Sequence, residues 1–255
     1  MPRLRIMLLG LVWIGLVGLE PSAVAQPAAS PAKPGATAPQ LPNCRFGEPI
    51  AALTSGTPAN TQLVAKVCLH KSGDQRLIRH SVELRAAQTG ARLQQASLPA
   101  TPTTTDALPA PALVLPGSPP LLVLPHGIAA ADLRLGSAEL VFEAQGKLLG
   151  AARDGDLLTL VEEAPAGDDR GGAPQLEWTV LDLEAGQVIG QAVLAGAAVD
   201  SVVLRRDKSG VYTELRLRGP KKSLILRAGI LGPDGKSLVK NGQLAVQVSA
   251  PGDAR

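Results

Sequence analysis

Apolar and polar side chains alternate along much of this chain, and the clearest case is residues 211–218. Val211, Leu215 and Leu217 fall on one face of an extended segment, whereas Glu214 and Arg216 fall on the other. This two-residue period is typical of an antiparallel strand that is buried on one face. Nothing convincing repeats at the helical period of 3.6 residues. The pattern therefore predicts strands rather than helices.

Similar short segments recur along the chain, and turn sequences rich in glycine separate them. The predicted strands are 64–69, 80–85, 112–115, 121–124, 139–143, 148–152, 157–162, 176–183, 188–194, 201–206, 211–218, 223–228 and 244–249. Asp-Gly at 154–155 and 234–235 and Asn-Gly at 241–242 supply turn chemistry between them. Short strands with frequent turn signals predict an all-β fold, an antiparallel β-sandwich-like architecture of one or two modules.

Two of these stretches resemble parts of a β-propeller blade. Residues 145–156 look like the inner strands of a blade, residues 179–190 look like its outer hairpin, and residues 84–93 repeat the pattern more faintly. Trp-Asp-repeat and quinoprotein-type propellers use this pattern, although the terminal Trp-Asp pair is missing here. The resemblance covers about one blade, and at about 40–45 residues per blade the chain holds at most about five. It implies an alternative fold, a divergent or truncated propeller.

The first 25 residues have the features of a bacterial Sec-type signal peptide. Arg3 and Arg5 precede an apolar run from Ile6 to Leu19, and a small-residue cleavage site ends at Ala25. Residues 26–41 are rich in proline and alanine, which predicts a disordered linker. We therefore expect a periplasmic or secreted protein without a transmembrane segment after signal cleavage.

The two cysteines fit an oxidising compartment. Cys44 and Cys68 are the only cysteines, and we expect them to form a disulfide there. They fall in a predicted N-terminal β module, residues 42–98. Residues 99–125 contain eight prolines and form a predicted connector whose apolar parts lie as short strands against a core, and residues 126–255 form a predicted C-terminal β domain.

Charge is unevenly distributed along the second half of the chain. Residues 139–200 carry twelve acidic and three basic side chains, whereas residues 205–240 carry ten basic and three acidic ones. This asymmetry predicts a surface for an anionic partner. Its candidate residues are Arg205, Arg206, Arg216, Arg218, Lys221, Lys222 and Arg227. In the alternative interpretation, acidic and basic strands lie side by side and neutralise one another.

Motifs for catalysis are weak. The histidines His70, His80 and His126 show no metal-ligand spacing, and Ser237 with Lys240 fits Ser-x-x-Lys only within a hairpin-like segment. A weak calcium candidate consists of Asp154, Asp156, Asp168 and Asp169 in and near an acidic insertion. No cofactor is expected.

The sequence therefore favours a non-enzymatic binding or assembly module that acts through sheet edges or the basic surface. Its expected partner is a protein or an anionic polymer. Nucleic acid is not expected, because aromatic residues make up only 2% of the chain and stacking platforms need several rings. Two alternatives stay open: a hydrolase-type enzyme with a loop-assembled site, and a propeller-like scaffold completed by a partner chain.

Overall fold

The computed structural model describes residues 43–52, 60–72, 74–163, 175–195, 198–218 and 223–249. Every regular element in this part of the chain is a strand, so the all-β prediction is confirmed. The predicted signal peptide, residues 1–25, and the predicted linker, residues 26–41, lie outside the described residues.

The strands form four successive units, which are numbered here in chain order. Unit 1 is built on a long hairpin whose strands are antiparallel throughout. It contains β1 (Asn43–Phe46), β2 (Ile50–Ala51), β3 (Thr61–Ser72), β4 (Gln75–Ala86), β5 (Arg92–Ser97) and β6 (Thr101–Thr103). The strands β1 and β2 pair with β3, and β6 pairs with β4.

Unit 2 is an antiparallel four-stranded meander in chain order. It contains β7 (Leu113–Leu115), β8 (Leu121–Leu124), β9 (Gly127–Asp132) and β10 (Ser137–Glu143). A parallel register pair between Ser137 and Ser97 joins it to β5, which makes units 1 and 2 one ten-stranded sheet. Residues 99–125 thus contribute β6, β7 and β8, whereas the predicted module boundaries stay predictions.

Units 3 and 4 repeat the four-stranded antiparallel meander as two separate sheets. Unit 3 contains β11 (Lys147–Asp154), β12 (Leu157–Glu163), β13 (Gln175–Asp182) and β14 (Gln187–Ala195). Unit 4 contains β15 (Ala198–Asp207), β16 (Gly210–Arg218), β17 (Ser223–Leu231) and β18 (Val246–Ser249). Both stretches with blade-like sequence, 145–156 and 179–190, fall within the segment that forms unit 3.

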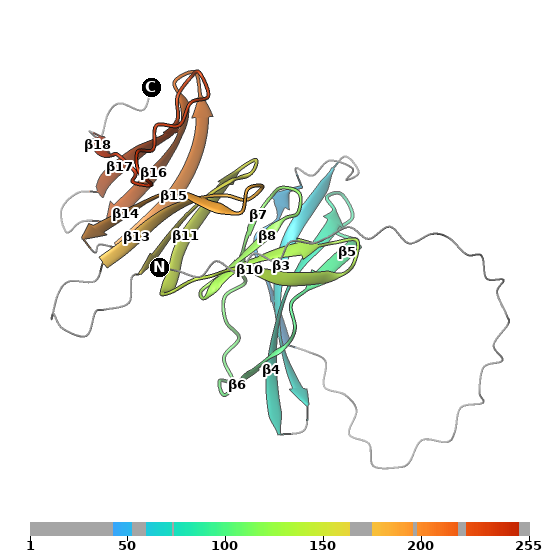
Figure 1. The fold of residues 1–255 in the computed structure, drawn as a ribbon. Coiled ribbons are helices and arrows are strands. Elements are labelled where there is room, and N and C mark those ends of the chain that lie inside the picture. Colours follow the sequence, from blue (N-terminus) through green and yellow to red (C-terminus); the bar gives the residue numbers. More distant parts are fainter. Residues whose placement is uncertain are drawn as a thin grey trace, which may run out of the picture.

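The four units pack against one another in series, and in Figure 1 they cross the picture from right to upper left in chain order. Three buried clusters hold the series together. The first joins units 1 and 2, the second joins units 2 and 3, and the third joins units 3 and 4. This arrangement is compatible with both expected architectures, since face-to-face packing is common to sandwiches and to propeller blades.

The middle units bury both of their faces, as β12 illustrates. Leu158 and Leu160 belong to the cluster shared with unit 2, whereas Leu157 and Val161 belong to the cluster shared with unit 4. A strand that is covered on both sides requires apolar side chains on both of its faces. Residues 157–161 are apolar except for Thr159, so this segment encodes a central position in the series.

A small polar network lies inside the junction of units 3 and 4. The Trp178 indole Nε1–H donates to Thr159 Oγ1 at 3.0 Å, and Thr213 Oγ1 of unit 4 lies 3.1 Å from the same oxygen. All three side chains are buried. These bonds satisfy polar groups that would be costly to bury without partners.

The predicted disulfide is confirmed. Cys44 and Cys68 form the bond, and their residues are direct partners in the register of β1 and β3. The bond ties the first strand of unit 1 to its central hairpin. It also fits a secreted or periplasmic protein, because disulfides persist in oxidising compartments.

Replacing both cysteines with alanine is expected to lower the free energy of unfolding by about 2–4 kcal/mol, because the cross-link restricts the unfolded chain. Urea denaturation of the wild type and of the Cys44→Ala/Cys68→Ala variant measures this difference. Reductant should shift the midpoint of the wild type only. A wild type whose midpoint ignores reductant would contradict the prediction.

Candidate binding surface

The outer face of unit 4 gathers most of the predicted basic residues that the structure describes. Along β16, Val211, Leu215 and Leu217 face unit 3, so Arg216 and Arg218 lie on the opposite face. Residues directly opposite in an antiparallel pair share a face. Arg205 is opposite Tyr212, and Arg227 is opposite Glu214. Arg205, Arg216, Arg218 and Arg227 therefore share this outer face.

The other candidates lie elsewhere. Arg206 lies on the inner side of unit 4, and its Nε is 3.0 Å from Asp154 Oδ2 of unit 3. Arg218 is on the outer face but pairs with Asp200 at 2.5 Å. These two ion pairs join the basic residues of 205–240 to the acidic residues of 139–200. Part of the charge is therefore neutralised, as the alternative interpretation of the sequence expected. Lys221 and Lys222 lie outside the described residues.

A stacked pair of side chains lies on this face. The Arg227 guanidinium carbon is 3.3 Å from the centre of the Tyr212 ring. Arg227 Nη2 is 3.7 Å from Asp207 Oδ2. The Ser209 hydroxyl and backbone N–H donate to Asp207, and these bonds hold the pKa of that carboxyl below its usual range. Burial raises the pKa of Tyr212. The ring and the carboxylate together orient the guanidinium plane.

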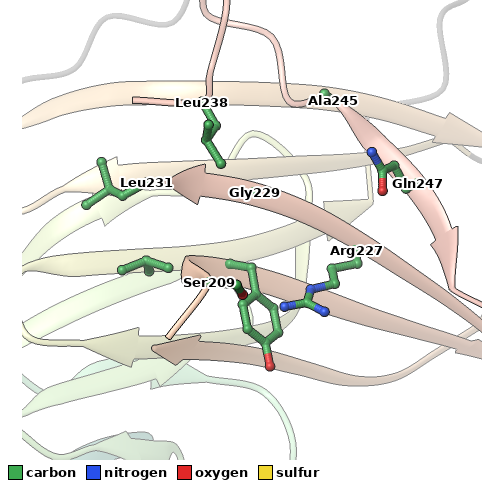
Figure 2. Close-up of a pocket in the computed structure, with 9 residues that line it drawn as sticks. Ser209, Arg227, Gly229, Leu231, Leu238, Ala245 and Gln247 are labelled. Atoms are coloured by element: carbon green, nitrogen blue, oxygen red, sulfur yellow. The ribbon is translucent and has the colours of Figure 1, made fainter. Parts of the chain in front are cut away.

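A hollow of about 420 Å³ adjoins the stacked pair (Figure 2). Tyr212, Arg227 and Gln247 line it together with the apolar residues Leu231 and Leu238. Leu238 crosses β17 at Gly229, where an added Cβ would lie 2.8 Å from Leu238 Cδ1. Glycine at this position therefore lets the segment after β17 fold back and form one wall of the hollow.

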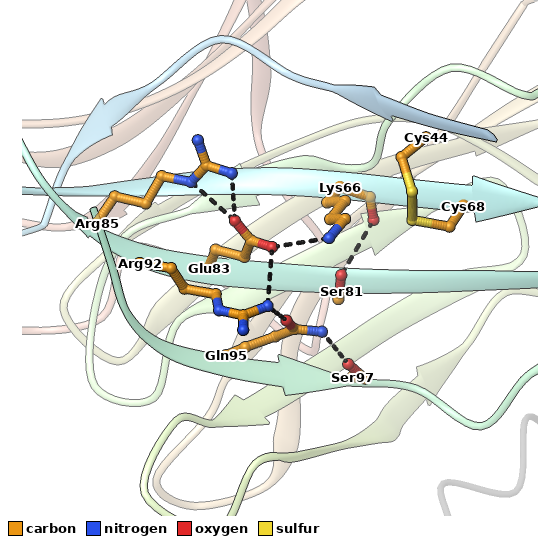
Figure 3. The surroundings of a disulfide bond; sticks show 9 residues. All are labelled: Cys44, Lys66, Cys68, Ser81, Glu83, Arg85, Arg92, Gln95 and Ser97. Carbon is orange, nitrogen blue, oxygen red and sulfur yellow. Dashed lines mark hydrogen bonds and ion pairs between the residues drawn. A yellow bond between two sulfur atoms is a disulfide. The ribbon is translucent and has the colours of Figure 1, made fainter. Parts of the chain in front are cut away.

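The outer face of unit 1 carries a different charge arrangement (Figure 3). Glu83 is only 1% exposed, and Lys66 Nζ and Arg85 Nε reach it at 3.0 and 2.8 Å. Arg92 Nη1 lies 3.9 Å away. Burial alone raises the pKa of Glu83, but the hydrogen bonds from Arg85 and Lys66 lower it below the usual value. Its cationic neighbours therefore cover it.

Two acidic side chains face each other on unit 3. Glu162 and Glu177 are directly opposite in the register of β12 and β13. Glu162 is buried and accepts the backbone N–H of Gln145 at 2.9 Å, while Gln191 donates to Glu177 at 2.7 Å. Burial, followed by the charge of Glu162, raises the pKa of Glu177. The sequence analysis did not single out this pair, although a glutamate at the end of one predicted strand and another near the start of the next were its signal.

The candidate catalytic residues are distributed over different units. His70 and His80 lie on β3 and β4, and His126 lies between β8 and β9, whereas Ser237 belongs to the segment after β17. Burial and the neighbouring His126 lower the pKa of His80, whose Nδ1 is buried and has no hydrogen-bond partner among the described residues. The Ser237 hydroxyl accepts the backbone N–H of Val239 at 3.2 Å, as in a turn.

The calcium candidates are divided as well. Asp154 pairs with Arg206, and Asp156 lies exposed in the turn between β11 and β12. Asp168 and Asp169 fall in residues 164–174, outside the described part of the chain. Within the described ranges, no three histidine, cysteine or acidic side chains gather in a metal-binding group. Nor does any helix there have the length and hydropathy to cross a membrane.

Comparison with known proteins gives a weak structural likeness. No protein-family model matches the chain, and no curated protein matches it. Among solved structures, the acylaminoacyl peptidase of Pyrococcus horikoshii in an orthorhombic crystal form is similar with a TM-score of 0.40 and 16% identity. The match covers 80% of this chain and 32% of that one. A likeness of this size carries no inference about activity.

Glu83→Gln is expected to lower the free energy of unfolding by about 1.5–3 kcal/mol at neutral pH, because it removes charge-assisted hydrogen bonds around a buried group. Urea denaturation measures this loss. Arg92→Gln is the control and should cost less than about 1 kcal/mol, since Arg92 is 57% exposed.

The difference in the free energy of unfolding between wild type and Glu83→Gln should shrink as the pH falls through the lowered pKa of Glu83 in the folded state. Equal losses in the two variants would contradict this assignment.

Glu177→Gln is expected to stabilise the protein at neutral pH by about 0.2–1 kcal/mol, because it removes a like-charge cross-strand pair and keeps an acceptor for Gln191. The folded-state pKa of Glu177 is raised, so the wild type gains stability as the pH falls through that value. The advantage of the variant should therefore vanish in acid. Denaturation across pH tests this, with exposed Glu184→Gln as control; an advantage independent of pH would count against it.

Proposed function

We propose that this protein is an exported, non-enzymatic binding module, and that the outer face of unit 4 binds an acidic segment of a partner protein or another anionic polymer. One observation carries the proposal: Arg205, Arg216, Arg218 and Arg227 come from three strands and share one face. Charges of one sign on a single face attract an oppositely charged partner over several ångströms in water.

The positions of the basic residues in 205–240 support this assignment. Arg206 faces unit 3 and neutralises Asp154, so its charge is used at the junction of units 3 and 4. Its neighbour Arg205 is exposed on the outer face. Glu214 shares that face, and Asp207 lies at the edge of it beside Arg227. Positive side chains therefore exceed negative ones where a partner would approach.

The polar ends of the series favour a surface contact over completion by further blades. A further sheet stacked on unit 4 would bury arginines that are now accessible to water, and unpaired buried charge is strongly unfavourable. Terminal units of stacked architectures carry polar outer faces for this reason. The candidate catalytic residues, by contrast, come from three units, since His70 and His80 lie in unit 1, His126 in unit 2 and Ser237 in unit 4, and this spread favours binding over hydrolysis.

Retention of the disulfide-bonded protein on immobilised poly-glutamate tests the function. We expect retention in about 0.05 M salt and release in about 0.5 M salt, where the Debye length is only a few ångströms and charges attract one another only at short range. The variant Arg205→Gln/Arg216→Gln/Arg227→Gln should bind at least about tenfold more weakly.

A matched variant controls for net charge. Arg45, Arg134 and Lys147 are exposed and lie on units 1, 2 and 3, so replacing all three with glutamine removes the same charge elsewhere. This control should bind as the wild type does. Equal losses in both variants, or no retention of the wild type at low salt, would overturn the proposed function.

A further inference from the structure

The hollow beside Tyr212 combines a cationic wall with an apolar one. Arg227 and Gln247 lie on neighbouring strands and are direct register partners, so their side chains share a face. Leu231 and Leu238 line the hollow as well, and Figure 2 shows Leu238 and Arg227 on separate sides of it. A volume of about 420 Å³ lies within the range of sites for small ligands or a few residues.

Arg227 has hydrogen-bonding capacity to spare. Its guanidinium is stacked on Tyr212, and the nearest oxygen of Asp207 is 3.7 Å away, beyond hydrogen-bond distance. Among the described residues, none accepts a hydrogen bond from Arg227. A guanidinium held flat against a ring presents its N–H groups as a planar fork that matches a carboxylate. The ring and the ion pair with Asp207 therefore orient the guanidinium, while its hydrogen-bond donors stay available for a second anion.

We propose that this hollow binds the carboxyl terminus of a peptide whose last side chain is aliphatic. The inference rests on the proposed function, because it names the part of an acidic partner that the outer face of unit 4 would recognise. The terminal carboxylate would accept hydrogen bonds from Arg227. The aliphatic side chain would pack on Leu231 and Leu238, and removing it from water supplies further affinity.

A peptide fits this chemistry better than a simple fatty acid does. The Gln247 side chain carries both a donor and an acceptor, and Ser209 adds a hydroxyl at the rim. A peptide has N–H and C=O groups next to its terminal carboxylate that can use these partners. A fatty acid has only the carboxylate, so Gln247 would stay unused.

Isothermal titration of the intact, disulfide-bonded protein tests the inference with three probes. They are the tripeptide acetyl-Gly-Val-Leu as the free acid, the same peptide as its carboxamide, and octanoate. The free acid should bind at least about tenfold more tightly than the carboxamide, since hydrogen bonds to a charged group are the stronger ones. Octanoate should bind more weakly than the free acid. Equal binding of acid and amide, or tighter binding of octanoate, would overturn the assignment.

Three substitutions distinguish hydrogen bonding by the planar guanidinium of Arg227 from general electrostatic attraction. Arg227→Lys keeps the charge but loses the planar pair of donors, so it should weaken binding of the free acid several-fold, and Arg227→Gln should do so more strongly. Arg134→Gln removes the same charge from unit 2, far from the residues that line the hollow, and it should leave peptide affinity unchanged. Equal effects of Arg134→Gln and Arg227→Gln would contradict a defined site.

The two proposals fail in different ways. If the wild type binds poly-glutamate in a salt-dependent manner but not the tripeptide acid, the hollow is not a carboxylate site and the binding surface stands. If poly-glutamate is not retained, the proposed function fails. Leu238→Ala is a further check, because it should weaken the tripeptide acid and leave poly-glutamate retention unchanged.

Discussion

Burial of aliphatic side chains between consecutive units is the interaction on which this structure depends. Each of the three clusters takes residues from two neighbouring units, so each unit packs against the next one along the chain. Fully burying one leucine or valine contributes about 1.5–3 kcal/mol. Units 2 and 3 need two apolar faces, as Leu157–Val161 illustrates, whereas units 1 and 4 need only one. The two remaining faces are therefore the places where charged residues can gather.

This constraint explains why neighbouring arginines have different roles. Arg205 and Arg206 are adjacent, so the strand period places them on opposite faces of unit 4. Arg206 meets unit 3, where Asp154 neutralises it, and Arg205 meets water. The position of the basic block in the last unit thus leaves part of its charge exposed. The same block in a middle unit would require a partner for each buried charge.

Much of this fold could be predicted from the sequence, because its strands alternate clearly. The segments 211–218, 157–162 and 188–194 all lie within observed strands, and two cysteines in a chain with a predicted signal peptide were enough to predict the disulfide. The strand β9 was missed, since Gly127–Asp132 is mostly buried and rich in alanine and lacks alternation. Periodicity also says nothing of which sheets touch. The pairing of Arg206 with Asp154, 52 residues away, and the stacking of Arg227 on Tyr212 are products of that tertiary packing.

On the outer faces of units 1 and 4, an aromatic ring lies against cationic side chains, but the chemical result differs. On unit 1, Phe46 lies against Lys66 and Arg85, at 5.4 and 4.7 Å from ring centre to charge, and on unit 4 Tyr212 lies against Arg227. In a chain with 2% aromatic residues, rings at both ends hold arginines in place. The donors of Arg85 are used by the buried carboxylate of Glu83. Arg227 has a ring and an ion pair with Asp207 at 3.7 Å, and none of the described residues accepts a hydrogen bond from it, so in our proposal another molecule supplies the carboxylate.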